Sequence, residues 1–102
     1  MYRASNHVQY DEWTTRVETA AAELDLTEDV VATATDLFLS EVPDDDRSKP
    51  AVLAACLYAG ALIEGESRSQ AAIADTVGVS RLSVQKRWKP LVTAAGFQPP
   101  EW

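Results

Sequence analysis

The stretch from Gln70 to Trp88, QAAIADTVGVSRLSVQKRW, constrains the fold most, because its spacing is that of two short helices joined by a tight turn. Ala74 stands fifth in the stretch, where two helices must approach each other closely. Gly78 stands ninth, where the turn needs a positive φ that glycine adopts without steric cost. Val84 stands fifteenth and would point from the second helix back into the first. The pattern predicts a helix-turn-helix.

Two serines support the boundaries of this motif. Ser69 and Ser80 stand directly before the two helices, where a hydroxyl can accept a hydrogen bond from an unpaired backbone N–H. The fourth helix of the chain is therefore expected over 70–77, and the fifth after Ser80. A packing unit with no role toward DNA can have the same spacing, so both interpretations stay open at this point.

The composition excludes several classes of protein. A chain of 102 residues can bury one core without disulfides or metal. No 18-residue apolar run is present and the first residues lack a signal peptide's apolar segment, so we expect a soluble cytoplasmic protein with no membrane partner. Cys56 and His7 are the single cysteine and histidine, which excludes an internal disulfide and a zinc finger. No cofactor is expected.

Charge is divided unevenly along the chain. Residues 1–65 hold 4 Lys/Arg and 13 Asp/Glu, a net charge of −9, whereas residues 66–102 hold 5 and 3, a net charge of +2. The basic groups therefore gather where the helix-turn-helix motif lies. The acidic surplus, with 16 alanines and three lysines, is similar to the surface of proteins from salt-loving archaea, where it aids solubility. An ordinary acidic mesophile protein is the alternative.

The first half of the chain also has helical patterning. Apolar residues at helical spacing predict a first helix starting near Asp11. Thr27 is a candidate N-cap for a second helix, and Leu26 before it can pack onto Val31 as a hydrophobic staple. That helix is expected to end at Pro43, and the acidic run that follows is expected to be a solvated loop.

The third predicted helix, AVLAACLYAGALIEG, is apolar on nearly every face. Such a helix belongs in the middle of a bundle, surrounded by the others. Cys56 is then a buried small side chain without a catalytic role. The chain divides into an N-terminal extension (1–10), one helical domain (11–96) and a C-terminal tail (97–102).

The fifth helix separates into two faces. Val84, Trp88 and Leu91 share one arc and are expected to face the core. Arg81 and Arg87 flank that arc, and each could contact phosphate or pair with a carboxylate of the protein. The opposite stripe is the candidate readout surface, and it contains Leu82, Gln85, Lys86 and Lys89.

The end of the fifth helix carries breaking signals. Pro90 has no backbone N–H and clashes with the carbonyl four residues back, so the helix is expected to kink or restart there. Gly96 is expected to end it, and Trp102 in the tail is expected to lie on the apolar surface.

Three blocks of the sequence resemble a cyclin repeat of the transcription factor IIB family. They are AAELDLTEDVVATATDLF, AVLAACLYAGALIEGESRSQ and IADTVGVSRLSVQKRWKPL, and the resemblance covers roughly residues 11–95. It implies an all-α fold, a five-helix cyclin-like bundle with a C-terminal helix-turn-helix. The last block looks like the DNA-reading half of the family's C-terminal repeat.

The resemblance also implies where DNA is read. In the family the fifth helix enters the major groove beside the TATA element, and Leu82 and Gln85 match its base contacts. Gln85 stands where the family often has arginine, so a guanine preference is not carried over; glutamine suits adenine better. These 102 residues contain no zinc ligands for the family's zinc ribbon and have room for one repeat, so we expect them not to recruit polymerase as the full factor does.

The sequence therefore predicts a DNA-binding transcriptional regulator that is not an enzyme, because no nucleophile–base pair, acid pair or phosphate loop is present. Double-stranded DNA is the expected partner, and a homodimer is favoured because one recognition helix contacts few base pairs. The alternative is an interaction module that binds the TATA-binding protein or another basal transcription protein without reading bases. Arg68, Lys86 and Lys89 are predicted to contact phosphate and Leu82, Ser83 and Gln85 to read bases; the full candidate set is Arg68, Gln70, Ser80, Arg81, Leu82, Ser83, Gln85, Lys86 and Lys89.

Overall fold

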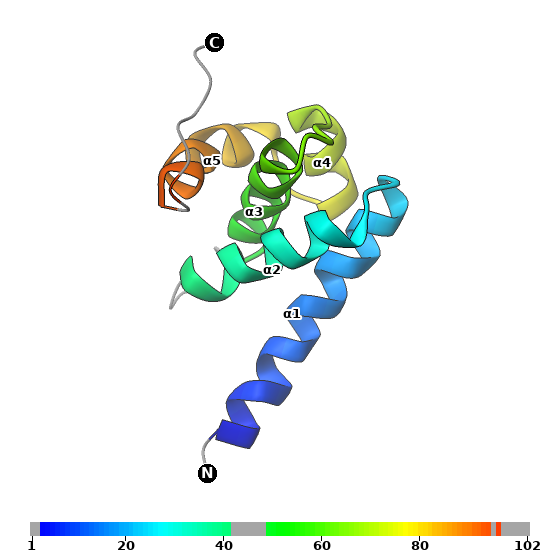
Figure 1. Ribbon diagram of the computed structural model, residues 1–102. Helices are drawn as coiled ribbons and strands as arrows, with labels where there is room; N and C mark the ends of the chain where they lie inside the picture. The colour runs from blue at the N-terminus through cyan, green and yellow to red at the C-terminus, as the bar shows by residue number, and fades with distance from the viewer. Residues whose placement is uncertain (1–2, 42–48, 95, 97–102) are drawn as a thin grey trace.

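The computed structural model describes the backbone of residues 3–41, 49–94 and 96, and side chains from residue 12 onward within these ranges except that of residue 41. Five α-helices make up the described part, in which no strand occurs (Figure 1). This confirms the all-α prediction. The helices are α1 (Arg3–Glu23), α2 (Glu28–Glu41), α3 (Lys49–Ile63), α4 (Gln70–Val77) and α5 (Arg81–Ala94).

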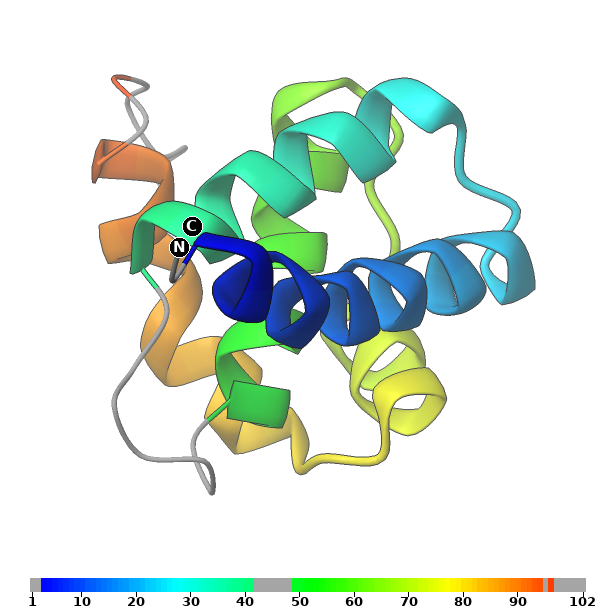
Figure 2. The same cartoon turned by 90° about the horizontal axis from the view of Figure 1, so that it is seen from below.

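Helix α3 lies in the middle of the bundle and packs against each of the other four helices (Figures 1 and 2). Leu53, Cys56 and Leu57 are fully enclosed, as the apolar sequence predicted, while Ile63 at the end of the helix is only partly buried. Gly60 allows α2 to approach closely, because a Cβ there would lie 3.1 Å from the backbone nitrogen of Ala34. The small residues of α3 therefore set the distance between the helices.

Helix α1 begins at Arg3, not near Asp11 as the sequence pattern predicted. Residues 3–10 contain neither glycine nor proline, so the helix can extend backward without a breaker. The predicted extension is thus largely helix. The predicted apolar face is confirmed further along, where Val17, Ala20 and Ala21 are buried against the core.

The segment between α1 and α2 differs from its prediction in one respect. Thr27 directly precedes α2, but its hydroxyl donates a hydrogen bond to Oε2 of Glu66, in the loop after α3. It is not seen to accept one from the backbone N–H groups in the first turn of α2, as an N-cap would. Leu26 and Val31 are both partly buried and pack against the core. Pro43 and the acidic run lie outside the described residues.

The sequence predicts a kink or a restart at Pro90; helix α5 continues through this proline to Ala94, so the restart does not occur. Proline removes only one hydrogen bond of the helix. Trp88 before it and Leu91 and Val92 after it are all buried, and their packing holds the two parts in one helix. Gly96, with φ +90°, follows the end of the helix as expected, and Trp102 lies outside the described residues.

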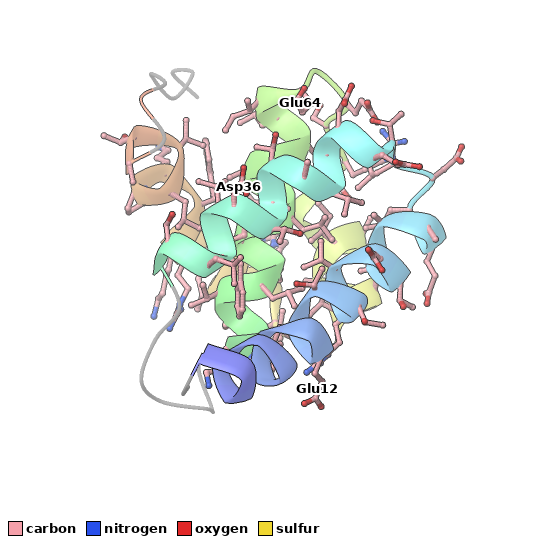
Figure 3. The ribbon with its side chains drawn as sticks, turned by 60° about the horizontal axis from the view of Figure 1, so that its bottom comes forward. Glu12, Asp36 and Glu64 are labelled. Atoms are coloured by element: carbon pink, nitrogen blue, oxygen red, sulfur yellow. The ribbon has the colours of Figure 1, made fainter. Side chains whose placement is uncertain are left out.

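The outer surface of the α1–α2 half is acidic. Glu12 on α1, Asp36 on α2 and Glu64 just beyond α3 are all exposed (Figure 3). Helices α2 and α5 each pack mainly against α3, with α1 as the second neighbour of α2 and α4 as the second neighbour of α5.

Candidate nucleic-acid interface

The helix-turn-helix predicted from the sequence is formed by α4 and α5. The hydroxyl of Ser69 accepts a hydrogen bond from the backbone nitrogen of Ala72 at 3.0 Å and caps α4. Gly78 ends α4 with φ +93°, and its N–H donates to the carbonyl of Ala74. The Ser80 hydroxyl accepts from the backbone nitrogen of Ser83 at 3.2 Å and caps α5. Both predicted caps and the predicted turn are confirmed.

The inner face of α5 is locked into the core. Val84 is 0 % exposed and Trp88 2 %, and both pack in the main hydrophobic cluster. The Trp88 ring meets Tyr58 of α3 edge-on, with centroids 5.3 Å apart. Such packing fixes the rotation of α5 about its axis, and so determines which side chains face outward.

The outer face of α5 presents the predicted stripe to solvent. Leu82 is 55 % exposed, and Gln85, Lys86 and Lys89 are exposed along the same face. The Lys89 ammonium group lies 5.7 Å from the centroid of the Trp88 ring. One helix therefore offers an apolar contact, an amide and two cations to a ligand outside.

A shallow depression of about 280 Å³ lies between the start of α4 and α5. Its lining residues are Gln70, Gln85, Trp88 and Lys89. Gln70 is the first residue of α4 and is half-buried, whereas Gln85 is exposed. The structure thus brings Gln70 together with two residues of the predicted readout surface.

Arg68, which the sequence predicted to contact phosphate, uses its side chain for contacts within the protein. Its guanidinium donates hydrogen bonds to the carbonyls of Leu24 and Asp25 at 3.0 Å, and to those of Glu66 and Ser67. These contacts hold the segment after α1 against the loop after α3. Sequence reasoning missed this role, because the carbonyls of Leu24 and Asp25 are more than 40 residues away in the sequence and carry no side-chain signal.

The other candidates occupy the edge of the interface. The hydroxyls of Ser80 and Ser83 are 3.0 Å apart, so both serines belong to the cap of α5. Arg81 is exposed beside this cap and Arg87 is half-buried. Among the described residues neither arginine pairs with a carboxylate, and both remain accessible to an anion.

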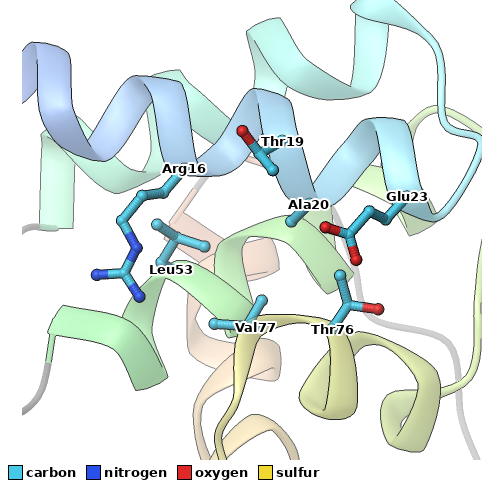
Figure 4. Close-up of a pocket in the computed structure, with 7 residues that line it drawn as sticks. All are labelled: Arg16, Thr19, Ala20, Glu23, Leu53, Thr76 and Val77. Carbon is cyan, nitrogen blue, oxygen red and sulfur yellow. The ribbon is translucent and has the colours of Figure 1, made fainter.

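Among the described residues, two further depressions are present at the surface. A cleft of about 180 Å³ lies between α1 and α4 over Leu53, and Arg16, Glu23 and Thr76 are among its lining residues (Figure 4). The part of the chain that the structure describes has no group of three or more potential metal ligands. No helix in that part is long and apolar enough to cross a membrane.

The second is a groove of about 540 Å³ between α1 and α2. Its floor is apolar, and Glu18 and Glu28 stand at its edges. The full lining is Glu18, Ala21, Ala22, Leu26, Glu28, Val31 and Ala32.

The arrangement described above defines a class, an all-α bundle whose last two helices form a helix-turn-helix. Comparison with known proteins narrows it: residues 8–94 match the model of the transcription factor TFIIB repeat, and the chain belongs to this family. The resemblance noted in the sequence, including its cyclin-like fold, is thereby confirmed.

Two relatives are similar over part of the chain. They are the transcription initiation factors IIB of Pyrococcus horikoshii and Pyrococcus abyssi, each 37 % identical over 54 residues. The match covers 53 % of this chain and 18 % of each relative. The salt-loving source suggested by the acidic composition remains a prediction.

Proposed function

We propose that this protein is a DNA-binding transcriptional regulator that reads double-stranded DNA with α5 in the major groove. The observation that carries the proposal is the exposed stripe of Leu82, Gln85 and the two lysines on a helix whose opposite face is buried. Side chains that read base edges must be exposed and must project from a backbone whose position is fixed. The outer stripe of α5 is exposed, and the buried inner face fixes the position of the helix.

The side chains of the stripe would make different kinds of contact with DNA. Lys86 and Lys89 would attract phosphates of any sequence, because ammonium groups release counterions from the DNA backbone. Leu82 is suited to the methyl group of thymine, and the Gln85 amide to a base edge. Arg81, beside the cap of α5, would add a phosphate contact. Arg68 is omitted from the contacts, because its guanidinium is engaged by four backbone carbonyls.

A second copy of the protein would add a second recognition helix to the complex with DNA. One recognition helix covers only a few base pairs, so proteins with this motif commonly present two. We expect a homodimer on DNA. Light scattering above the binding midpoint tests this, and a monomer both free and on DNA would contradict it.

The central test is a folded variant in which Leu82, Gln85, Lys86 and Lys89 are all alanine. Sequences are selected from a random DNA pool with wild type and variant in molar KCl, and their affinities are then compared. We expect the wild type to enrich a motif and the variant to lose both affinity and selectivity. The matched control replaces the exposed Leu39 and Ser40 of α2 by alanine, which should leave binding unchanged.

The groove between α1 and α2 favours a second candidate function, that of an interaction module. Its apolar floor and its two carboxylates fit a helix with aliphatic side chains flanked by lysine or arginine, and we assign this occupant to a basal transcription protein. If the fourfold α5 variant binds DNA with unchanged selectivity, this function takes first place. Replacing the exposed Ala22 and Ala32 of the groove by arginine should then abolish partner binding.

A further inference from the structure

Two glutamines from different helices share one depression on the proposed DNA-facing side. Gln70 opens α4, Gln85 lies in the outer stripe of α5, and both line the hollow in front of Trp88. The capped turn and the buried Trp88 fix the two helices relative to each other. Among the described residues neither side-chain amide has a hydrogen-bond partner, and the two are not bonded to each other, so both are available to form a hydrogen bond when DNA binds.

A glutamine that reads adenine must present its amide in one orientation. The bidentate contact uses the amide oxygen toward N6 of adenine and one amide N–H toward N7. The oxygen and nitrogen ends of an amide have nearly the same size, so packing alone does not choose between the two orientations. A second amide can choose, because its oxygen accepts the remaining N–H of the first.

We propose that Gln70 is a positioning residue that orients the Gln85 amide, so that the two glutamines form one adenine-reading element. The inference rests on the proposed function, since it assumes that α5 lies in the major groove. It assigns to Gln70 a role in selectivity, whereas a contact with phosphate would raise the affinity for all sequences alike.

The test uses the site selected by wild type, with the base that depends on Gln85 identified by Gln85→Ala. Affinities are measured for this site with adenine, guanine or 7-deazaadenine at that position. We expect Gln70→Ala to lower the preference for adenine over guanine by about fivefold to tenfold, a part of what a bidentate contact contributes. In the Gln85→Ala background the same change should have no further effect on preference.

Two variants separate orientation from general affinity. Gln70→Glu keeps an oxygen that accepts from Gln85, so the preference for adenine should survive while repulsion from phosphate weakens binding to all sites. Lys89→Ala, in the same depression, should weaken all sites equally and leave the preference unchanged.

The outcomes distinguish the inference from the proposal beneath it. A uniform loss for Gln70→Ala, or an unchanged preference, overturns the role of Gln70 and leaves DNA reading by α5 intact. A Gln85-dependent base other than adenine overturns the adenine assignment. A wild type that enriches no sequence overturns the proposed function together with the inference.

Discussion

The two halves that flank α3 are built by different means. In the α4–α5 half, Ser69, Gly78 and Ser80 set the caps and the turn through contacts within three or four residues. In the α1–α2 half, the connection is held by Arg68 and Glu66, whose partners lie about 40 residues away. One half is therefore determined by local sequence and the other by the tertiary fold.

The two halves also differ in what they show to solvent. The outer face of α5 carries cations and an exposed leucine, whereas the groove between α1 and α2 carries carboxylates at its edges. An acidic surface repels DNA, so in the proposed complex only the α5 side can approach it. The net charge of the whole chain does not show this division, so the distribution of charge along the chain is the better guide to a binding partner.

The largest expected effect concerns the helix on which both halves pack. Leu57 is 0 % exposed in α3, so Leu57→Ala should lower the free energy of unfolding by about 2–5 kcal/mol. Leu82→Ala removes the same atoms from a side chain that is 55 % exposed and should have little effect on stability. Urea denaturation measures both, and equal midpoints for the two variants would contradict the central position of α3.

The next effect tests whether Arg68 belongs to the fold or to the DNA contact. Arg68→Ala removes a guanidinium that holds four carbonyls and should cost about 1–3 kcal/mol of stability, since hydrogen bonds of charged groups are the stronger ones. At a temperature where the variant is folded, the salt dependence of DNA binding should be unchanged. A slope lowered by about one counterion would restore the phosphate contact predicted from the sequence.

The turn of the helix-turn-helix gives a smaller effect that is local in origin. Gly78 has φ +93° and open space around the position of a Cβ, so Gly78→Ala adds strain without a clash. We expect a loss of about 1–2 kcal/mol, the cost of a left-handed conformation for an L-residue, and a smaller loss for Gly78→Asn. Thermal unfolding compares the two, and an alanine variant as stable as wild type would contradict the strain.

These contrasts show what the sequence could predict. The caps at Ser69 and Ser80, the turn at Gly78 and the two faces of α5 follow from local spacing, and the structure confirms each. The start of α1 was missed because apolar periodicity fades before Asp11 while the backbone stays helical. The persistence of α5 through Pro90 depends on burial by other helices, which no local rule contains.

The candidate site divides in the same way. The stripe of α5 could be predicted from angular spacing alone. The role of Arg68 could not, because its partners are backbone carbonyls brought near by folding. That Gln70 and Gln85 line one depression likewise could not be predicted, because it depends on how α4 and α5 pack.

The smallest expected effect is the pH dependence of the stability that Glu66 gives to the connection between α1 and α2. Hydrogen bonds from the hydroxyl and the backbone N–H of Thr27 lower the pKa of Glu66 below its ordinary value of 4.5, and the charge of Arg68 adds to this. Because the folded state has the lower pKa, this stabilisation is complete above about pH 4.5 and is lost as the pH falls through the folded value. Glu66→Gln should therefore destabilise the protein at pH 7 and less so at pH 3.

Urea midpoints of wild type and Glu66→Gln at the two pH values measure this difference. Glu12→Gln is the control, because it removes one exposed carboxylate of α1 that the structure does not place at the connection. A Glu66→Gln deficit of the same size at pH 3 and pH 7 would show that the charge of Glu66 contributes nothing. The connection would then depend on Arg68 and on packing alone, and the α1–α2 half would be insensitive to acid at this point.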